Sequence, residues 1–109
     1  MPAKSGALSA VGAASAEKWF RPSGLPHEGG RPASFWWTIS RATAFAATVA
    51  LERSTDDGAT WERLTYVDGT PMEWTGPVCT VLPELEHAAI YRPVVTAHAS
   101  GVVTWKLGR

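Results

Sequence analysis

The chain contains a single cysteine, and this scarcity excludes two classes of cross-linked protein. Cys79 has no second thiol among the 109 residues, so the chain can form neither an internal disulfide framework nor a zinc site with several cysteines. Because Cys79 lies in an expected strand, we predict that it is a small buried hydrophobe. Long apolar runs are also missing: none approaches the roughly 20 residues that a membrane-spanning helix needs. We therefore expect no membrane partner.

An excess of charge of either sign is absent as well. Ten Lys and Arg residues balance ten Asp and Glu residues, which gives a formal net charge of zero. A nucleic-acid-binding protein normally concentrates basic residues on one face, so this balance argues against a nucleic-acid partner. Copies of a neutral chain repel one another only weakly, which is compatible with close packing of many subunits.

Catalytic signatures are equally scarce. The chain has no Gly-x-Ser-x-Gly sequence, no phosphate-binding loop and no dinucleotide-binding fingerprint. His27, His87 and His98 stand in separate contexts, without the spacing of a metal pair. Asp56 and Asp57 are adjacent in a turn and cannot face each other across a cleft, as paired catalytic carboxylates do. We expect no enzymatic activity, no metal and no cofactor.

Composition divides the chain near residue 33. Residues 1–16 are rich in Ala, Gly and Ser, and the loop 22–32 contains three prolines and three glycines. Between them, residues 17–21 form a short strand-like patch. Small flexible residues of this kind are typical of an arm that becomes ordered on a partner. We therefore predict an extended N-terminal arm with its loop over 1–32 and a single folded domain over 33–109.

Period-two alternation dominates the rest of the chain. Phe35, Trp37 and Ile39 share one face of an expected strand, while Trp36 and Thr38 share the other. No 3.6-residue apolar stripe is sustained, and turn residues separate the alternating runs. The expected strands are 33–40, 46–53, 61–67, 72–80, 89–97 and 102–107. This pattern predicts an all-β fold, a single antiparallel β-sandwich of six or seven short strands, Ig-like or jelly-roll-like.

One turn has a sharp motif, Ser-x-Asp-x-Gly-x-Thr-Trp, at Ser54, Asp56, Gly58, Thr60 and Trp61. Between two alternating runs it predicts the tip of a hairpin, where the Asp carboxylate accepts hydrogen bonds from the turn itself. The glycine supplies a positive φ, and the tryptophan is expected to turn inward and cap the core. These roles are structural.

The motif resembles the Asp-box of sialidases and related β-proteins. In propeller sialidases the boxes recur on successive blades and lie away from the catalytic centre. This chain has one box, no internal repeat and too few residues for several four-stranded blades. The resemblance therefore implies a structural turn and does not imply glycosidase activity.

A broader resemblance covers residues 33–109. The segments Val-Ala-Leu-Glu-Arg-Ser, Asp-Gly-Ala-Thr-Trp-Glu-Arg-Leu, Glu-His-Ala-Ala-Ile-Tyr-Arg and Ser-Gly-Val-Val-Thr-Trp-Lys-Leu occur in this order. Together they resemble small β-sandwich structural proteins of tailed bacteriophage virions and gene transfer agents. The long Pro/Gly insert and the tryptophan content depart from that pattern. The resemblance implies localisation in the virion after synthesis in the host cytoplasm, and the weak apolar content of the first 20 residues argues against secretion.

Six tryptophans are the strongest compositional anomaly. Three of them lie on faces that the alternation directs into the core: Trp37, Trp61 and Trp105. Trp36 is expected to point outward, because neighbours in a strand point to opposite faces. Trp19 lies beside Phe20 in the N-terminal segment. We predict that Trp19, Phe20 and Trp36 contact another subunit, unless the arm folds back over Trp36.

These observations lead to one expected function and two alternatives. The expected function is a capsid decoration (cement) or head-spike protein, held to other virion proteins by its arm and repeated as a homo-oligomer, with a trimer as the first guess. A neck or tail component, such as a collar or fibre-base protein, is the alternative within the virion. A carbohydrate-binding β-sandwich that recognises host surface glycans through Trp36 or Trp74 is the alternative outside it. Deleting residues 1–32 should separate attachment from glycan binding.

Overall fold

The computed structural model describes residues 3–22, 33–41, 44–84, 86 and 88–109. Within these ranges the regular structure is strand apart from one short 3₁₀ helix. The elements in chain order are β1 (Ala3–Leu8), β2 (Gly12–Ala13), η1 (Ala16–Lys18), β3 (Ala33–Ile39), β4 (Phe45–Ser54), β5 (Glu62–Arg63), β6 (Glu73–Trp74), β7 (Val78–Glu84), β8 (Ile90–Gly101) and β9 (Val103–Gly108).

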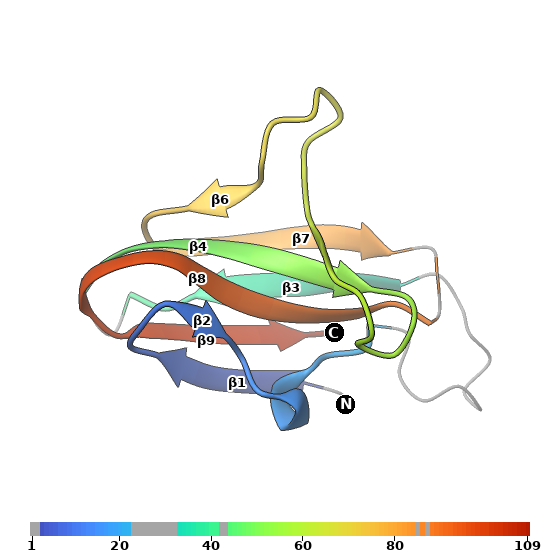
Figure 1. Cartoon of the computed structure of the whole chain (residues 1–109), viewed down its shortest axis with the longest axis horizontal. Coiled ribbons are helices and arrows are strands. Elements are labelled where there is room, and N and C mark those ends of the chain that lie inside the picture. Colours follow the sequence, from blue (N-terminus) through green and yellow to red (C-terminus); the bar gives the residue numbers. More distant parts are fainter. Residues whose placement is uncertain (1–2, 23–32, 42–43, 85, 87) are drawn as a thin grey trace.

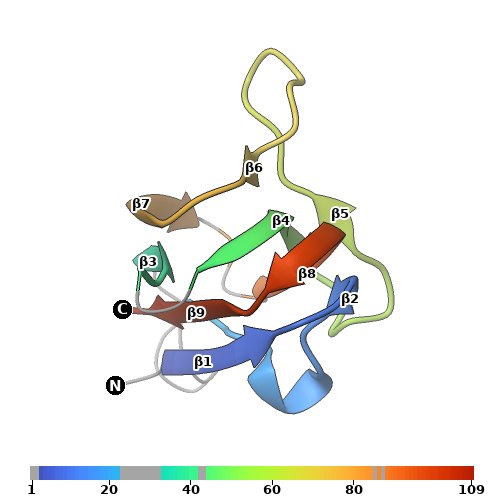
Figure 2. The same cartoon turned by 90° about the vertical axis from the view of Figure 1, so that its left-hand side faces the viewer.

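The strands form two antiparallel sheets that pack face to face (Figures 1 and 2). The first sheet has the order β1-β9-β3-β7. The second has the order β2-β8-β4-β5, and β6 also pairs with β4. The expected antiparallel β-sandwich is therefore confirmed.

The core lies between the two sheets and follows the alternation in β3. Phe35 and Trp37 are fully buried, whereas Trp36 between them is 52% exposed. The other sheet supplies the facing side chains, including Tyr91, whose ring centroid lies 4.6 Å from that of Phe35. Trp74 from β6 closes one flank, with its ring 5.7 Å from Trp37. Full burial of aromatic side chains of this size supplies much of the apolar area on which the fold depends.

The N-terminal segment is part of the sandwich, so the predicted separate arm is wrong for residues 3–22. Every residue of β1 pairs with β9, and β2 pairs with β8. The backbones of Phe20 and Tyr91 exchange two hydrogen bonds, of 2.9 and 2.8 Å. Small residues allow this packing: a Cβ on Gly6 would lie 3.2 Å from the Trp105 ring. The composition that suggested a flexible arm instead lets an edge strand lie flat over a bulky core residue.

Other element boundaries also differ from expectation. The patch at 17–21 is the end of a 3₁₀ turn followed by the Phe20 bridge. The two expected strands 61–67 and 72–80 are largely replaced by the short β5 and β6, and strand pairing resumes at β7. The tip of the intervening hairpin, residues 64–72, stands away from the sandwich (Figures 1 and 2), while Leu64 at its base packs on the core. The rest of the Pro/Gly loop, 23–32, lies outside the described residues.

Candidate interaction surfaces

The Asp-box turn is built as the sequence predicts. The Ser54 hydroxyl donates to Asp56 Oδ1 at 2.7 Å and accepts the N–H of Gly58 at 3.0 Å. Asp56 in turn accepts the N–H of Thr60 at 2.9 Å and its hydroxyl at 2.5 Å. These bonds, those from Thr60 above all, lower the pKa of the Asp56 carboxyl to about 2. The polar side chains of Ser54, Asp56 and Thr60 are thus bonded within the turn.

Trp19 packs on this turn within the same chain. Its ring lies 5.1 Å from that of Trp61 in an edge-to-face arrangement. Gly58 has a φ of 91°, and a Cβ placed there would lie 2.5 Å from the Trp19 ring. Arg21 also contacts this turn: its guanidinium lies 3.7 Å from the Asp57 carboxylate. The N-terminal segment therefore folds back over the Asp-box turn. The alternative given from the sequence was a fold over Trp36.

Gly58→Ala should lower the free energy of unfolding by about 1–3 kcal/mol, because the new methyl group meets both an unfavourable φ and the Trp19 ring. Gly76→Ala is the matched control, since a Cβ there has no atom within 4 Å. Urea denaturation of the two variants measures the difference. Equal stabilities would mean that the turn and the Trp19 ring are not held as described.

Trp61 does not enter the core, contrary to the inward position predicted for it. It is partly buried, and its ring lies 4.1 Å from the Arg92 guanidinium. Arg92 also bonds Glu52, its cross-strand neighbour on the outer face of the second sheet, at 2.8 Å. The expected strand 61–67 began at Trp61, but β5 begins at Glu62. Trp61 therefore lies outside the paired strand, and the period-two alternation does not fix the direction of its side chain.

Phe20 is a core residue, which overturns its predicted role at a subunit interface. It is 1% exposed, and its ring centroid lies 5.7 Å from that of Phe35. An aromatic residue beside a Pro/Gly loop suggested a docking plug, but the two backbone bonds to Tyr91 draw it between the sheets. Of the three predicted interface residues, Trp36 is exposed, Trp19 is partly buried and Phe20 is buried.

Trp36 stands on the outer face of the first sheet, within an apolar patch that we call the Trp36 face. Its cross-strand neighbour in β7 is Val81, which is 44% exposed. Cys79 and Pro83 in β7 are exposed on the same side, so the prediction that Cys79 is buried is wrong. The reason is the alternation of β7, in which Val78, Thr80 and Leu82 take the inner face. The Trp36 face is defined by Trp36, Val81, Cys79, Pro83 and the hollow beside them.

The hollow has a volume of about 200 Å³ and lies on the β9 side of Trp36. Gly108, the cross-strand neighbour of Trp36 in β9, lines this hollow. The exposed residues Lys106 and Arg109 line the hollow together with Thr38, and among the residues that the structure describes no carboxylate side chain does so. This place is therefore apolar at its centre and basic at its rim.

A buried charge network, which sequence reasoning missed, joins the two sheets. Arg53 in β4 donates two hydrogen bonds to the Glu84 carboxylate in β7, of 2.5 and 2.9 Å. The Tyr91 hydroxyl donates a third, of 2.6 Å, and the N–H of Glu86 a fourth, of 2.9 Å. Burial by itself would raise the pKa of Glu84, but these donors outweigh it and lower that pKa to about 2. Burial and the neighbouring Glu84 carboxylate raise the pKa of Tyr91.

Sequence offered little signal for this network, since Arg53 lies 31 residues before Glu84 in the chain. A glutamate in an otherwise alternating strand, on the inward face of Val78, Thr80 and Leu82, was the one available sign. A hollow beside the network is lined by Leu64, Pro83 and the network's own side chains. Because the Glu84 carboxylate is already bonded by four donors, the network is suited to joining the sheets.

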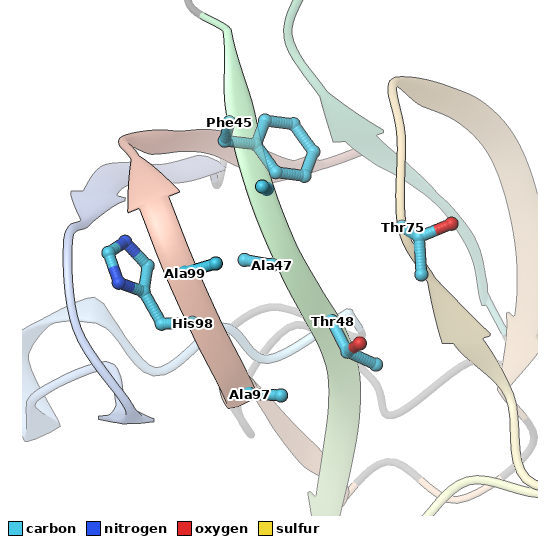
Figure 3. A pocket seen from close by; sticks show the side chains of 8 residues that line it. Phe45, Ala47, Thr48, Thr75, Ala97, His98 and Ala99 are labelled. Carbon is cyan, nitrogen blue, oxygen red and sulfur yellow. The ribbon is translucent and has the colours of Figure 1, made fainter.

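A third hollow lies over the ends of β4 and β8 and has a volume of about 540 Å³ (Figure 3). Its walls are mainly short side chains, with Phe45 at one end and Thr75 across from it. His98 contributes the one titratable group, and its ring nitrogen lies 2.8 Å from the carbonyl oxygen of Gly101. This hollow lacks the convergent polar groups that fix a small ligand. His27 and His87 lie outside the described residues.

In the part of the chain that the structure describes, no cluster of three or more His, Cys, Asp or Glu side chains could hold a metal ion. The same part contains no helix that is long and apolar enough to cross a membrane. Comparison with known proteins finds no matching family, no matching curated protein and no matching solved structure. The Trp36 face is therefore the candidate interaction surface on physical grounds alone.

Proposed function

We propose that this chain is a non-enzymatic structural protein of a bacteriophage virion, a capsid decoration or head-spike protein that docks through the Trp36 face. The observation that carries the proposal is Trp36 itself, half exposed beside Val81 on a regular, well-packed sheet. Exposed tryptophan is a typical interface anchor, and a rigid sheet presents it without loss of chain entropy on binding. The virion setting rests on the resemblance carried by the segments now found in β4, β8 and β9.

The attachment point in this proposal is the sheet face and not the N-terminal arm. Deleting residues 1–32 would remove β1, β2 and the buried Phe20, so such a deletion would test folding and not attachment. A point substitution on the outer face avoids that problem, because the side chain supports no part of the core.

Trp36→Ser should lower binding to virions that lack this protein at least about tenfold, while the melting temperature stays within a few degrees of the parent. Val11→Ser is the matched control, since Val11 is a 64% exposed apolar residue away from this face. Co-sedimentation with the particles, followed by quantification of the bound protein, measures both variants. Unchanged occupancy with Trp36→Ser would contradict the proposed docking face.

A neck or tail station is the alternative within the virion, and labelling of the bound protein in electron micrographs would distinguish head from neck. A carbohydrate-binding role through Trp36 is the alternative in another class. The hollow beside Trp36, at about 200 Å³, is smaller than the roughly 300–1,000 Å³ of ordinary small-ligand sites. It is better matched to one protein side chain. Glycan-array binding that Trp36→Ser abolishes would reverse this preference.

A further inference from the structure

Two groups of exposed charges, of opposite sign, lie at different ends of the molecule, although the net charge is zero. The hairpin 64–72 and its flanks carry the exposed acids Glu62, Asp68 and Glu73, together with one exposed base, Arg63. Arg63 is already directed to Glu52, at 3.6 Å. The β1–β9 side carries the exposed bases Lys4, Lys106 and Arg109. Figures 1 and 2 both place the hairpin at one extreme and β1 at the other.

The tip of the hairpin combines apolar and acidic groups in a preformed turn. Tyr66 is 50% exposed and Val67 is fully exposed. The N–H of Tyr66 donates to the carbonyl of Thr70 at 2.8 Å, and the N–H of Thr70 donates to Asp68 Oδ1 at 3.0 Å. The bond from the Thr70 N–H also lowers the pKa of the Asp68 carboxyl, so this group is ionised at neutral pH. The tip therefore presents an aromatic ring, a branched aliphatic side chain and a negative charge.

The hollow beside Trp36 has the complementary set of groups. Its centre offers the indole of Trp36, and its rim offers Lys106 and Arg109. The stem of Lys106 lies along Gly108, with its Cε 3.8 Å from the place of a Cβ there. The ammonium group is thus held at the edge of the hollow, where a carboxylate from outside can reach it.

We propose that the hairpin tip of one copy docks on the Trp36 face of a second copy. Tyr66 and Val67 pack against the Trp36 indole, and the Asp68 carboxylate pairs with Lys106 and Arg109. This inference rests on the proposed function and deepens it: neighbouring copies on the virion are the partners that meet at the Trp36 face, so the occupancy lost in Trp36→Ser is contact between copies. Because the two surfaces are different, the contact is heterologous, and it produces a closed ring, such as a trimer, or an open filament.

A charge-swap experiment tests this pairing on the full chain. Sedimentation velocity over a range of concentrations up to about 100 μM should show association that weakens as salt is raised. Asp68→Lys and Lys106→Glu should each weaken the association at least about tenfold. Glu73→Lys is the matched control, since it makes the same charge change away from the tip and should leave association within about twofold.

Mixing the two charge variants gives the decisive result. In the mixture, the basic tip of the Asp68→Lys variant meets the acidic face of the Lys106→Glu variant. The tip of the Lys106→Glu variant and the face of the Asp68→Lys variant are unchanged, so they pair as in the parent. An equal mixture should therefore recover association through alternating copies of the two variants, as pairs, open chains or rings with an even number of copies, whereas a trimer ring keeps one unswapped contact. Failure of the mixture to recover, or a parent chain that stays monomeric throughout the concentration range, would overturn the pairing.

The same variants separate this inference from the proposed function. Asp68→Lys with normal virion occupancy, alongside Trp36→Ser with lost occupancy, would mean that the Trp36 face meets a different virion protein. In that case the self-pairing is wrong and the docking role of the face stands. If Asp68→Lys and Trp36→Ser both lose self-association but keep normal virion occupancy, the pairing is supported. The docking of the Trp36 face on the virion is then contradicted.

Discussion

Phe20→Ala is expected to lower the free energy of unfolding by about 3–5 kcal/mol, because Phe20 is 1% exposed and packs on Phe35 in the core. The loss combines the transfer free energy of the ring with the cavity that it leaves between the sheets. Urea denaturation at neutral pH measures it. Trp36→Ala is the matched aromatic control, and its cost should stay below about 1 kcal/mol since that side chain is half exposed.

The Phe20 result also tests the place of the N-terminal segment. If β1, β2 and Phe20 formed a separate arm, removing the ring would leave the stability of the sandwich unchanged. A cost as small as that of Trp36→Ala would therefore contradict the packing of residues 3–22 into the fold. The denaturant m-value should stay the same, because the surface exposed on unfolding changes little.

Glu84→Gln is expected to lower the free energy of unfolding by about 2–4 kcal/mol at pH 7. Glu84 is 8% exposed, and its carboxylate accepts both Arg53 bonds and the Tyr91 bond. The amide keeps the shape of the side chain but leaves the Arg53 guanidinium without its counter-charge. Glu62→Gln is the control, since Glu62 is exposed in β5, and it should cost less than about 0.5 kcal/mol.

The same variant should change the pH dependence of stability. In the folded protein the pKa of Glu84 is about 2, below its ordinary value of 4.5. A lowered pKa means that the stabilisation is fully present above pH 4.5 and is lost as the pH falls toward 2. Glu84→Gln should therefore be less sensitive than the parent to acid over this range. Asp56 titrates in the same range in both proteins, so only the difference between the two profiles belongs to Glu84.

Parallel pH profiles for the parent and Glu84→Gln would contradict the network as described. So would a Glu84→Gln variant as stable as Glu62→Gln at pH 7. A Glu84→Gln variant that is less stable than the parent at pH 7, and whose free energy of unfolding falls less in acid, would support a charge network that joins β4, β7 and β8.

Local patterns were sufficient for several features of this protein. Alternation placed Phe35 and Trp37 inside and Trp36 outside, because the side-chain period of a strand is two whatever lies around it. The Asp-box turn was predictable for a similar reason: Ser54, Asp56 and Thr60 bond one another within a single short turn. The absence of a helical stripe, together with these turns, was sufficient to predict an antiparallel sandwich.

Features that depend on contacts between distant segments were decided only by the tertiary structure. Phe20 resembled a loop residue until its backbone paired with that of Tyr91, far along the chain. Glu84 and Arg53, in strands of opposite sheets, could not be recognised as a pair from either strand alone. The Ala/Gly/Ser composition of β1 fits a loose arm and a flat edge strand equally well. The structure has the edge strand, in which Gly6 pairs with Trp105 and lies against its ring. Periodicity records which way a side chain points, but which partner it meets depends on how the sheets are assembled.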